Sequence, residues 1–223
     1  MAKLYFRYGA MNSGKSTALL QAAHNYEERG QRVVLIKPRV DTKGADQIVS
    51  RLGVTRTVDV VVEPHDNMVA LVAEQIDLLQ GQTGERLACV LVDEAQFLTP
   101  RQVDELFIAA VQINIPILAY GIRTDFQTVA FPGSRRMLEI AHSLEELKTI
   151  CRCGRKAVFN GRKVDGKFIF DGDQVAIDGQ NVTYESLCGE CYLAESGGKL
   201  ASGYSADNAI GFSEPMGPDS DFS

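Results

Sequence analysis

The chain has 223 residues, of which 45% are hydrophobic and 23% are charged, and its formal net charge is −6. This composition is typical of a globular protein with one full core and a small appendage. No apolar run approaches the roughly 20 residues of a membrane span, and the N-terminus has no signal-peptide layout, so we expect a cytoplasmic protein without a membrane partner. Most of the net charge lies in the C-terminal tail, and the balanced body has no basic stripe, which argues against a nucleic-acid partner.

Short apolar runs alternate with amphipathic segments through the first 150 residues. Strands are expected at residues 4–8, 32–37, 87–92 and 115–120, and a polar loop at 38–53. Helices are expected from Thr17 to Gly30, from Glu63 to Gly81, from a capping box at Thr99 to Gln112, and from Arg135 to Ala141. This βαβ alternation predicts an α/β fold in which a parallel sheet has helices on both faces.

The pattern changes after residue 150. Asp-Gly pairs at 165–166, 171–172 and 178–179 are typical of hairpin turns, so a second, smaller unit of short strands is expected. The last residues are rich in Gly, Ser, Pro and Asp and have no periodicity. The expected domains are an ATP-binding unit at 1–150, a β-rich unit at 151–195 and a disordered acidic tail at 196–223.

Residues 9–16 match the phosphate-binding pattern G-x-x-x-x-G-K-[ST] (the P-loop) between an expected strand and an expected helix. Inward-facing N–H groups and the helix N-terminus would hold phosphate, Lys15 would face the β- and γ-phosphates, and Ser16 would ligate Mg²⁺. An ordinary glycine–serine turn is the alternative. The expected ATP-binding residues of the loop are Gly9, Ala10, Met11, Asn12, Ser13, Gly14, Lys15 and Ser16.

Two adjacent carboxylates, Asp93 and Glu94, follow the apolar run at 87–92. In P-loop proteins an acid at this strand end helps to hold Mg²⁺, so Asp93 is the expected acid on the metal side. Glu94 is placed to orient a hydroxyl or a water and to accept its proton. A charged strand end that faces solvent is the alternative. The expected ATP site continues through Asp93, Glu94, Ala95 and Gln96.

Four of the five cysteines form two close pairs, Cys151-x-Cys153 and Cys188-x-x-Cys191. Zinc prefers four tetrahedral thiolates, which two such pairs supply from two chain segments. Structural zinc would stabilise a unit that is too small to build a sufficient core. Unrelated buried thiols and a single redox pair are the alternatives, and Cys89 is expected to be a core thiol because it lies within an apolar strand.

With these motifs placed, the chain resembles the zinc-containing (type II) thymidine kinases of bacteria over residues 3–195. The resemblance rests on Gly-x-Met-x-Ser-Gly-Lys-Ser at 9–16, Asp-Glu-x-Gln-Phe at 93–97, Tyr-Gly-Ile-Arg-Thr-Asp-Phe at 120–126, Phe131, and the paired cysteines around a segment that ends in Tyr184. Two positions depart from the family pattern. The pair at Cys151 is C-x-C instead of the commoner C-x-x-C, and Asp178-Gly179 stands where many relatives have Gly-Gly.

The resemblance implies ATP-dependent phosphorylation of the thymidine 5′-hydroxyl to dTMP, for nucleotide salvage, in a homotetramer that uses Mg²⁺ and structural zinc. Glu94 matches the family's catalytic base. A zinc-anchored lasso loop between the cysteine pairs would close over thymidine. The implied substrate-binding positions are Met11, Asp41, Phe97, Ile122, Phe126, Phe131, Val175 and Tyr184.

The main alternative function is a P-loop ATPase that uses the cysteine unit as a zinc ribbon on nucleic acid. Asp93-Glu94-Ala95-Gln96 is similar to a helicase box, but the balanced charge of the body and the lack of a second helicase core argue against it. The P-loop and the cysteines fall in different expected units. Zinc loss is therefore expected to damage thymidine binding far more than ATP binding.

Overall fold

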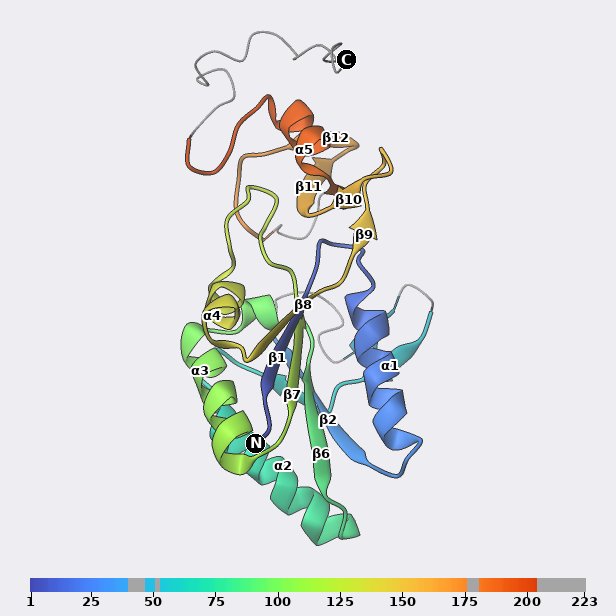
Figure 1. Ribbon diagram of the computed structural model, residues 1–223, viewed down its shortest axis with the longest axis vertical. Helices are drawn as coiled ribbons and strands as arrows, with labels where there is room; N and C mark the ends of the chain where they lie inside the picture. Colours follow the sequence, from blue (N-terminus) through green and yellow to red (C-terminus); the bar gives the residue numbers. More distant parts are fainter. Residues whose placement is uncertain (40–46, 51–52, 176–180, 204–223) are drawn as a thin grey trace, which may run out of the picture.

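The computed structural model describes residues 1–39, 47–50, 53–175 and 181–203. Its larger part is a six-stranded parallel sheet with helices on both faces, which confirms the predicted α/β fold. A smaller part, made of short strands and one helix, lies beyond one end of that sheet (Figure 1). The predicted tail from residue 204 onward and the Asp178-Gly179 turn lie outside the described residues.

The central sheet has the strand order β5-β2-β6-β7-β1-β8, and every neighbouring pair is parallel. Its strands are β1 (Leu4–Tyr8), β2 (Arg32–Pro38), β5 (Val60–Val62), β6 (Leu87–Val92), β7 (Ile117–Gly121) and β8 (Ser143–Glu146). Because all six strands run the same way, the residues that follow β1, β6 and β7 meet at one edge of the sheet. In open parallel sheets this carboxyl edge is where ligands bind.

Helices cover the two faces of the sheet with separate apolar cores. On one face, α1 (Lys15–Glu27) packs Leu19 and Ala23 against Leu35 and Leu118. The other face is covered by α2 (Met68–Thr83), α3 (Pro100–Ile108) and α4 (Pro132–Ile140). A 3₁₀ turn (Ala95–Phe97) follows β6, and a π-helical stretch (Ala109–Ile113) follows α3. The predicted capping box of α3 is confirmed, since the side chains of Thr99 and Gln102 each bond the other's backbone N–H.

Several boundaries differ from the predictions for identifiable reasons. α2 begins at Met68 and not at Glu63, because Asn67 caps it by accepting from Ala70 N at 2.9 Å. The predicted loop at 38–53 contains β3 (Gln47–Val49), which pairs with β4 (Thr55–Thr57). The strands β5 and β8 were not predicted, and β8 has the mostly polar sequence Ser-Leu-Glu-Glu that suits an edge strand.

The smaller part contains a three-stranded antiparallel sheet of order β12-β11-β13. Its elements are β9 (Thr149–Ile150), β10 (Lys156–Ala157), β11 (Phe159–Val164), β12 (Lys167–Ile169), β13 (Val182–Leu187) and α5 (Gly189–Ser196). The predicted hairpin at Asp165-Gly166 is confirmed, with φ of 48° and 79° at the two turn residues. The buried hydrophobic residues of this part are Cys151, Ala157, Leu187, Cys188 and Tyr192.

Within the described ranges, no helix combines the length and apolar character that crossing a bilayer requires.

Candidate active site

The phosphate loop connects β1 to α1 at the carboxyl edge of the sheet. Asn12 and Gly14 both have left-handed backbone angles, with φ of 69° and 79°, and these turn the chain into the first residue of α1. Glycine adopts such angles without steric cost and asparagine tolerates them. The Lys15 ammonium folds back over the loop and donates to Ala10 O at 3.0 Å, and Ser13 N donates to the same carbonyl at 3.3 Å.

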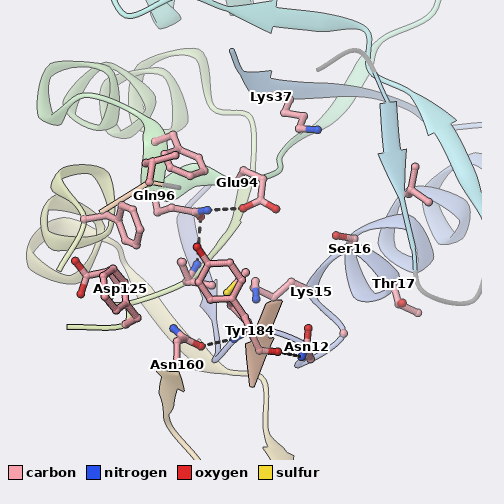
Figure 2. Close-up of a pocket in the computed structure, with 18 of the residues that line it drawn as sticks. Asn12, Lys15, Ser16, Thr17, Lys37, Glu94, Gln96, Asp125, Asn160 and Tyr184 are labelled. Atoms are coloured by element: carbon pink, nitrogen blue, oxygen red, sulfur yellow. Dashed lines mark hydrogen bonds between the residues drawn. The ribbon is translucent and has the colours of Figure 1, made fainter. Parts of the chain in front are cut away.

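Asp93 and Glu94 leave β6 next to this loop. Asp93 is 4% exposed, and its burial together with the Glu94 charge raises the pKa of its carboxyl group. Glu94 has a left-handed φ of 50° and lines the cavity that Lys15 and Ser16 also line (Figure 2). The two neighbouring acids thus have different surroundings: Asp93 is buried, and Glu94 reaches the cavity.

The buried side chain of Gln96 fixes the orientation of Glu94. Its Oε1 accepts from Ile122 N at 3.2 Å, so its amide group must point toward the Glu94 carboxylate, to which it donates. A Cβ at Gly121 would lie 2.8 Å from Gln96 Oε1, which explains the glycine at the end of β7. The chain after β7 therefore fixes the Gln96 side-chain amide, and this amide fixes the Glu94 carboxylate at the end of β6.

The cavity has a volume of about 990 Å³ and spans the space between the sheet edge and the smaller part. On one side it is lined by the phosphate loop, and on another by rings. Phe97 and Phe131 pack edge to face with centroids 5.5 Å apart. The cavity brings together thirteen of the predicted site residues: Met11, Asn12, Gly14, Lys15, Ser16, Glu94, Gln96, Phe97, Ile122, Phe126, Phe131, Val175 and Tyr184.

The other predicted residues of the ATP site lie outside the cavity lining. Gly9, Ala10 and Ser13 form the back of the phosphate loop, whereas Asp93 and Ala95 are buried beside it. Asp41 lies outside the described residues.

Arg162, on β11, organises the chain that leads toward residue 175. Its guanidinium donates to Asp173 O and Gln174 O, both at 2.7 Å, and to the Tyr184 hydroxyl at 3.1 Å. Its Cζ lies 3.7 Å from the centre of the Phe126 ring. Arg162 thus joins an aromatic wall of the cavity to the two segments that flank residues 176–180.

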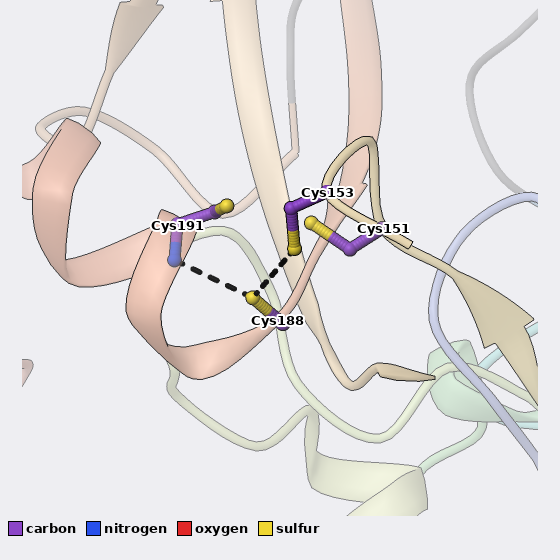
Figure 3. Close-up of side chains that lie close together, drawn as sticks. All are labelled: Cys151, Cys153, Cys188 and Cys191. Carbon is purple, nitrogen blue, oxygen red and sulfur yellow. Dashed lines mark hydrogen bonds between the residues drawn. The ribbon is translucent and has the colours of Figure 1, made fainter. Parts of the chain in front are cut away.

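Four cysteine sulfur atoms meet in the smaller part. The Sγ atoms of Cys151, Cys153, Cys188 and Cys191 all lie within 4.8 Å of one another (Figure 3). Zinc–thiolate bonds of about 2.3 Å in a tetrahedron would place the sulfurs about 3.8 Å apart, so this donor set fits zinc. Cys188 Sγ accepts from Cys191 N at 3.5 Å, a bond that lowers the pKa of the Cys188 thiol and favours the thiolate that a metal needs.

Cys89 is separate from this group and lies in β6 with no exposed surface. Its burial raises the pKa of its thiol to about 12, in keeping with the core position that was predicted.

Several cavity residues escaped sequence reasoning. Lys37 is the penultimate residue of β2 and lies at the same carboxyl edge as Asp93. The rule that ligands bind at the carboxyl edge of a parallel sheet would have indicated this position. Asp125 lies within the 120–126 motif but was not singled out. Asn160, on β11, and Gln174, in the segment between β12 and β13, carried no signal, because no motif marks a polar residue whose partners are distant in sequence.

Comparison with known proteins identifies the family. A family model described as thymidine kinase matches residues 2–192. A thymidine kinase of Idiomarina loihiensis is 50% identical over 190 residues, which cover 84% of this chain and 94% of the relative. A thymidine kinase of Ruegeria pomeroyi is 43% identical over 206 residues, which cover 92% of this chain and all of the relative. The predicted resemblance is confirmed, and this chain belongs to the thymidine kinase family.

Proposed function

We propose that this chain transfers the γ-phosphoryl group of ATP to the 5′-hydroxyl of thymidine and forms dTMP. The observation that carries the proposal is one cavity with two chemically different ends. The phosphate-loop residues Lys15 and Ser16 line the cavity and the Glu94 carboxylate faces it (Figure 2). The rings of Phe97 and Phe131, packed against each other, line the same cavity. An apolar, aromatic end suits an uncharged thymine ring better than a charged acceptor.

At the phosphate end, the loop backbone and the N-terminus of α1 would bind the ATP phosphates. Ser16 and Asp93 would hold Mg²⁺, which neutralises the charge of the transferring phosphoryl group. The surroundings of Asp93 suit a cation, because a buried carboxylate beside a second carboxylate is costly to ionise unless a positive charge is near. In this proposal Gly9, Ala10, Met11, Asn12, Ser13, Gly14, Ala95 and Gln96 complete the ATP side.

At the nucleoside end, Met11, Ile122, Phe126, Val175 and Tyr184 would complete the wall around thymidine. The lasso loop between the two cysteine pairs, which carries Val175 and Tyr184, would close over the thymine ring and be anchored by the zinc-bound cysteines. Closure would exclude water, which otherwise competes with the alcohol for the γ-phosphate.

Glu94 would orient the 5′-hydroxyl and accept its proton. A primary alcohol is a weak nucleophile, but the phosphoryl transition state is loose, so a correctly held carboxylate need only accept the proton late. The hydrogen bond from Gln96 would keep one carboxylate oxygen fixed and leave the other for the substrate.

We extend the proposal to the whole protein as a cytoplasmic homotetramer with one structural zinc per chain. Its partners would be thymidine and ATP, without nucleic acid or a membrane.

A nucleoside panel tests the function directly. The zinc-loaded protein is incubated with ATP and Mg²⁺ and with thymidine, deoxyuridine, deoxycytidine or deoxyadenosine, and the monophosphates are separated. We expect dTMP to form with thymidine. ATP hydrolysis that is stimulated by single-stranded DNA, without dTMP formation, would instead favour a zinc-ribbon ATPase.

A further inference from the structure

The phosphate loop contacts the smaller part directly, through the backbone of Met11. Met11 N donates to Asn160 Oδ1 at 2.7 Å, and Met11 O accepts from the Ser186 hydroxyl. Asn160 and Ser186 are direct cross-strand partners on β11 and β13. A single pair of facing residues in the antiparallel sheet therefore bonds both polar groups of one loop residue.

These two side chains are buried and positioned for this contact. Asn160 is 2% exposed and Ser186 is 7% exposed. The other end of the Asn160 amide donates to Thr124 O at 2.8 Å, so the loop after β7 sets which end faces Met11. Asn12, the next loop residue, donates to Tyr184 O at 3.4 Å. Tyr184 and Ser186 are two residues apart and so lie on the same face of β13.

The bond to Met11 N acts on the residue that would hold the nucleotide phosphates. Met11 N and Ala10 O belong to one planar peptide, and the two groups point in opposite directions. Asn160 fixes one side of this plane, and Lys15 Nζ and Ser13 N bond the carbonyl on its other side. Turning this peptide would displace the Lys15 ammonium and the following left-handed turn at Asn12.

We propose that Asn160 and Ser186 are positioning residues for the phosphate loop, so that the antiparallel sheet of the smaller part sets the affinity for ATP. This inference rests on the proposed function, since it assumes that the loop binds the triphosphate of ATP. It differs from the expectation that the loop depends on the α/β core alone.

The test compares four variants with the wild type as zinc-loaded, full-length protein. Ser186→Ala and Asn160→Ala each remove one bond to Met11, and Ser186→Thr keeps the hydroxyl. Thr183→Ala is the matched control, because it removes a hydroxyl from an exposed position on the opposite face of β13. The readouts are the Kd of β,γ-imido-ATP with Mg²⁺, the Kd of thymidine, the zinc content, and KM and kcat.

We expect Ser186→Ala and Asn160→Ala to weaken β,γ-imido-ATP binding by about tenfold, the size of one well-placed hydrogen bond whose partner is left unpaired. Zinc content should stay at the wild-type value, and KM for ATP should rise. For Ser186→Ala, whose side chain is absent from the cavity lining, KM for thymidine should change far less. Ser186→Thr should restore affinity, and Thr183→Ala should resemble the wild type.

Wild-type affinity for β,γ-imido-ATP in both alanine variants would overturn the inference. Equal losses of ATP and thymidine affinity in Ser186→Ala, with a lowered melting temperature, would also overturn it, because they would indicate general destabilisation. Failure of the wild type to form dTMP would instead refute the proposed function, and the nucleotide titrations would still report on the loop.

Discussion

Glu94 is held in a backbone conformation that a non-glycine residue seldom adopts. Its φ of 50° places it in the left-handed region, which costs on the order of 1–3 kcal/mol. The surroundings over-determine this geometry, because Asp93 N bonds Ile36 O at 2.9 Å on one side and Gln96 fixes the carboxylate on the other. The strained residue is thus the one whose carboxylate reaches the cavity.

Glu94→Gln should leave ATP and thymidine binding close to wild type and lower kcat by about 10²-fold or more, since the amide has no basic oxygen to accept a proton. Steady-state kinetics and direct titration of both ligands measure the two effects separately. Near-normal turnover with intact binding would exclude Glu94 as the base.

Asp93 offers a pH-dependent prediction. Its pKa is raised to about 7 by burial and by the Glu94 charge, so the folded protein binds this proton more tightly than the unfolded chain, whose Asp has a pKa of about 3.9. The stability from this group is full below about pH 4 and is lost as the pH rises through 7. The Asp93→Asn variant has no carboxyl group at this position, so it does not lose this stability as the pH rises.

The melting temperature of Asp93→Asn minus that of the wild type should therefore become more positive between pH 5 and pH 8 in magnesium-free buffer. Asp165→Asn, in an exposed hairpin turn, is the control and should show a constant difference from wild type. A pH-independent difference for Asp93→Asn would contradict the assignment.

At the scale of elements, β11 carries Arg162, which bonds the chain on both sides of residues 176–180. Arg162 bonds two carbonyls of the 173–174 segment and the Tyr184 hydroxyl, and Gln174 in turn donates to Asp125 Oδ2 at 2.9 Å. A guanidinium can make these bonds at once because its donors form a rigid fork. The apolar wall at Phe126, the 173–174 segment and Tyr184 thus depend on one side chain.

Arg162→Met should weaken thymidine binding by tenfold or more, on the basis that hydrogen bonds to a charged group contribute roughly 1.5–3 kcal/mol each. Methionine keeps much of the apolar contact with Phe126 but has no donor. Lys163→Met, on the opposite face of β11, is the matched control. Unchanged thymidine affinity in Arg162→Met, measured by calorimetric titration, would show that the segment is held by other contacts.

The elements that sequence reasoning placed well are those with a local physical signature. The buried strand before Asp93, the capping box at Thr99 and the Asp165-Gly166 hairpin each depend on neighbouring residues, and the structure has all three. β8 was missed because an edge strand needs no apolar alternation. α5 was missed because its cysteines were read as ligands and not as the first turn of a helix, which Cys188 caps.

The site could be predicted where its residues belong to a motif, as for Lys15 and Glu94. It could not be predicted where the contact joins segments far apart in sequence. Asn160 meets Met11 across 149 positions, and nothing near either residue indicates the pairing. The contacts between the two parts of the molecule were for this reason the least predictable feature.

At the scale of the whole molecule, the smaller part and the sheet edge are joined at several points. Besides the bonds to Met11, the Tyr192 hydroxyl of α5 donates to Phe126 O at 2.7 Å. Ser186 lies two residues before Cys188, and Tyr192 follows Cys191 directly, so both contacts are close in sequence to the cysteine cluster. Disorder at the cysteine cluster would reach the ATP side and the nucleoside side alike.

Removing zinc should therefore lower the affinities for both β,γ-imido-ATP and thymidine, against the expectation that ATP binding survives. Structural zinc contributes on the order of 10 kcal/mol to small metal-dependent folds, so its loss should disorder β11 and β13 and release Met11. Both ligands are titrated with Mg²⁺ before and after a zinc-selective chelator, and again after zinc is restored. The Cys191→Ala variant should behave like the chelated protein. The Cys89→Ala variant should keep the zinc at the four-cysteine cluster, because Cys89 does not belong to that cluster. If thymidine binding were lost while the β,γ-imido-ATP affinity stayed at its wild-type value, the phosphate loop would be independent of the cysteine cluster.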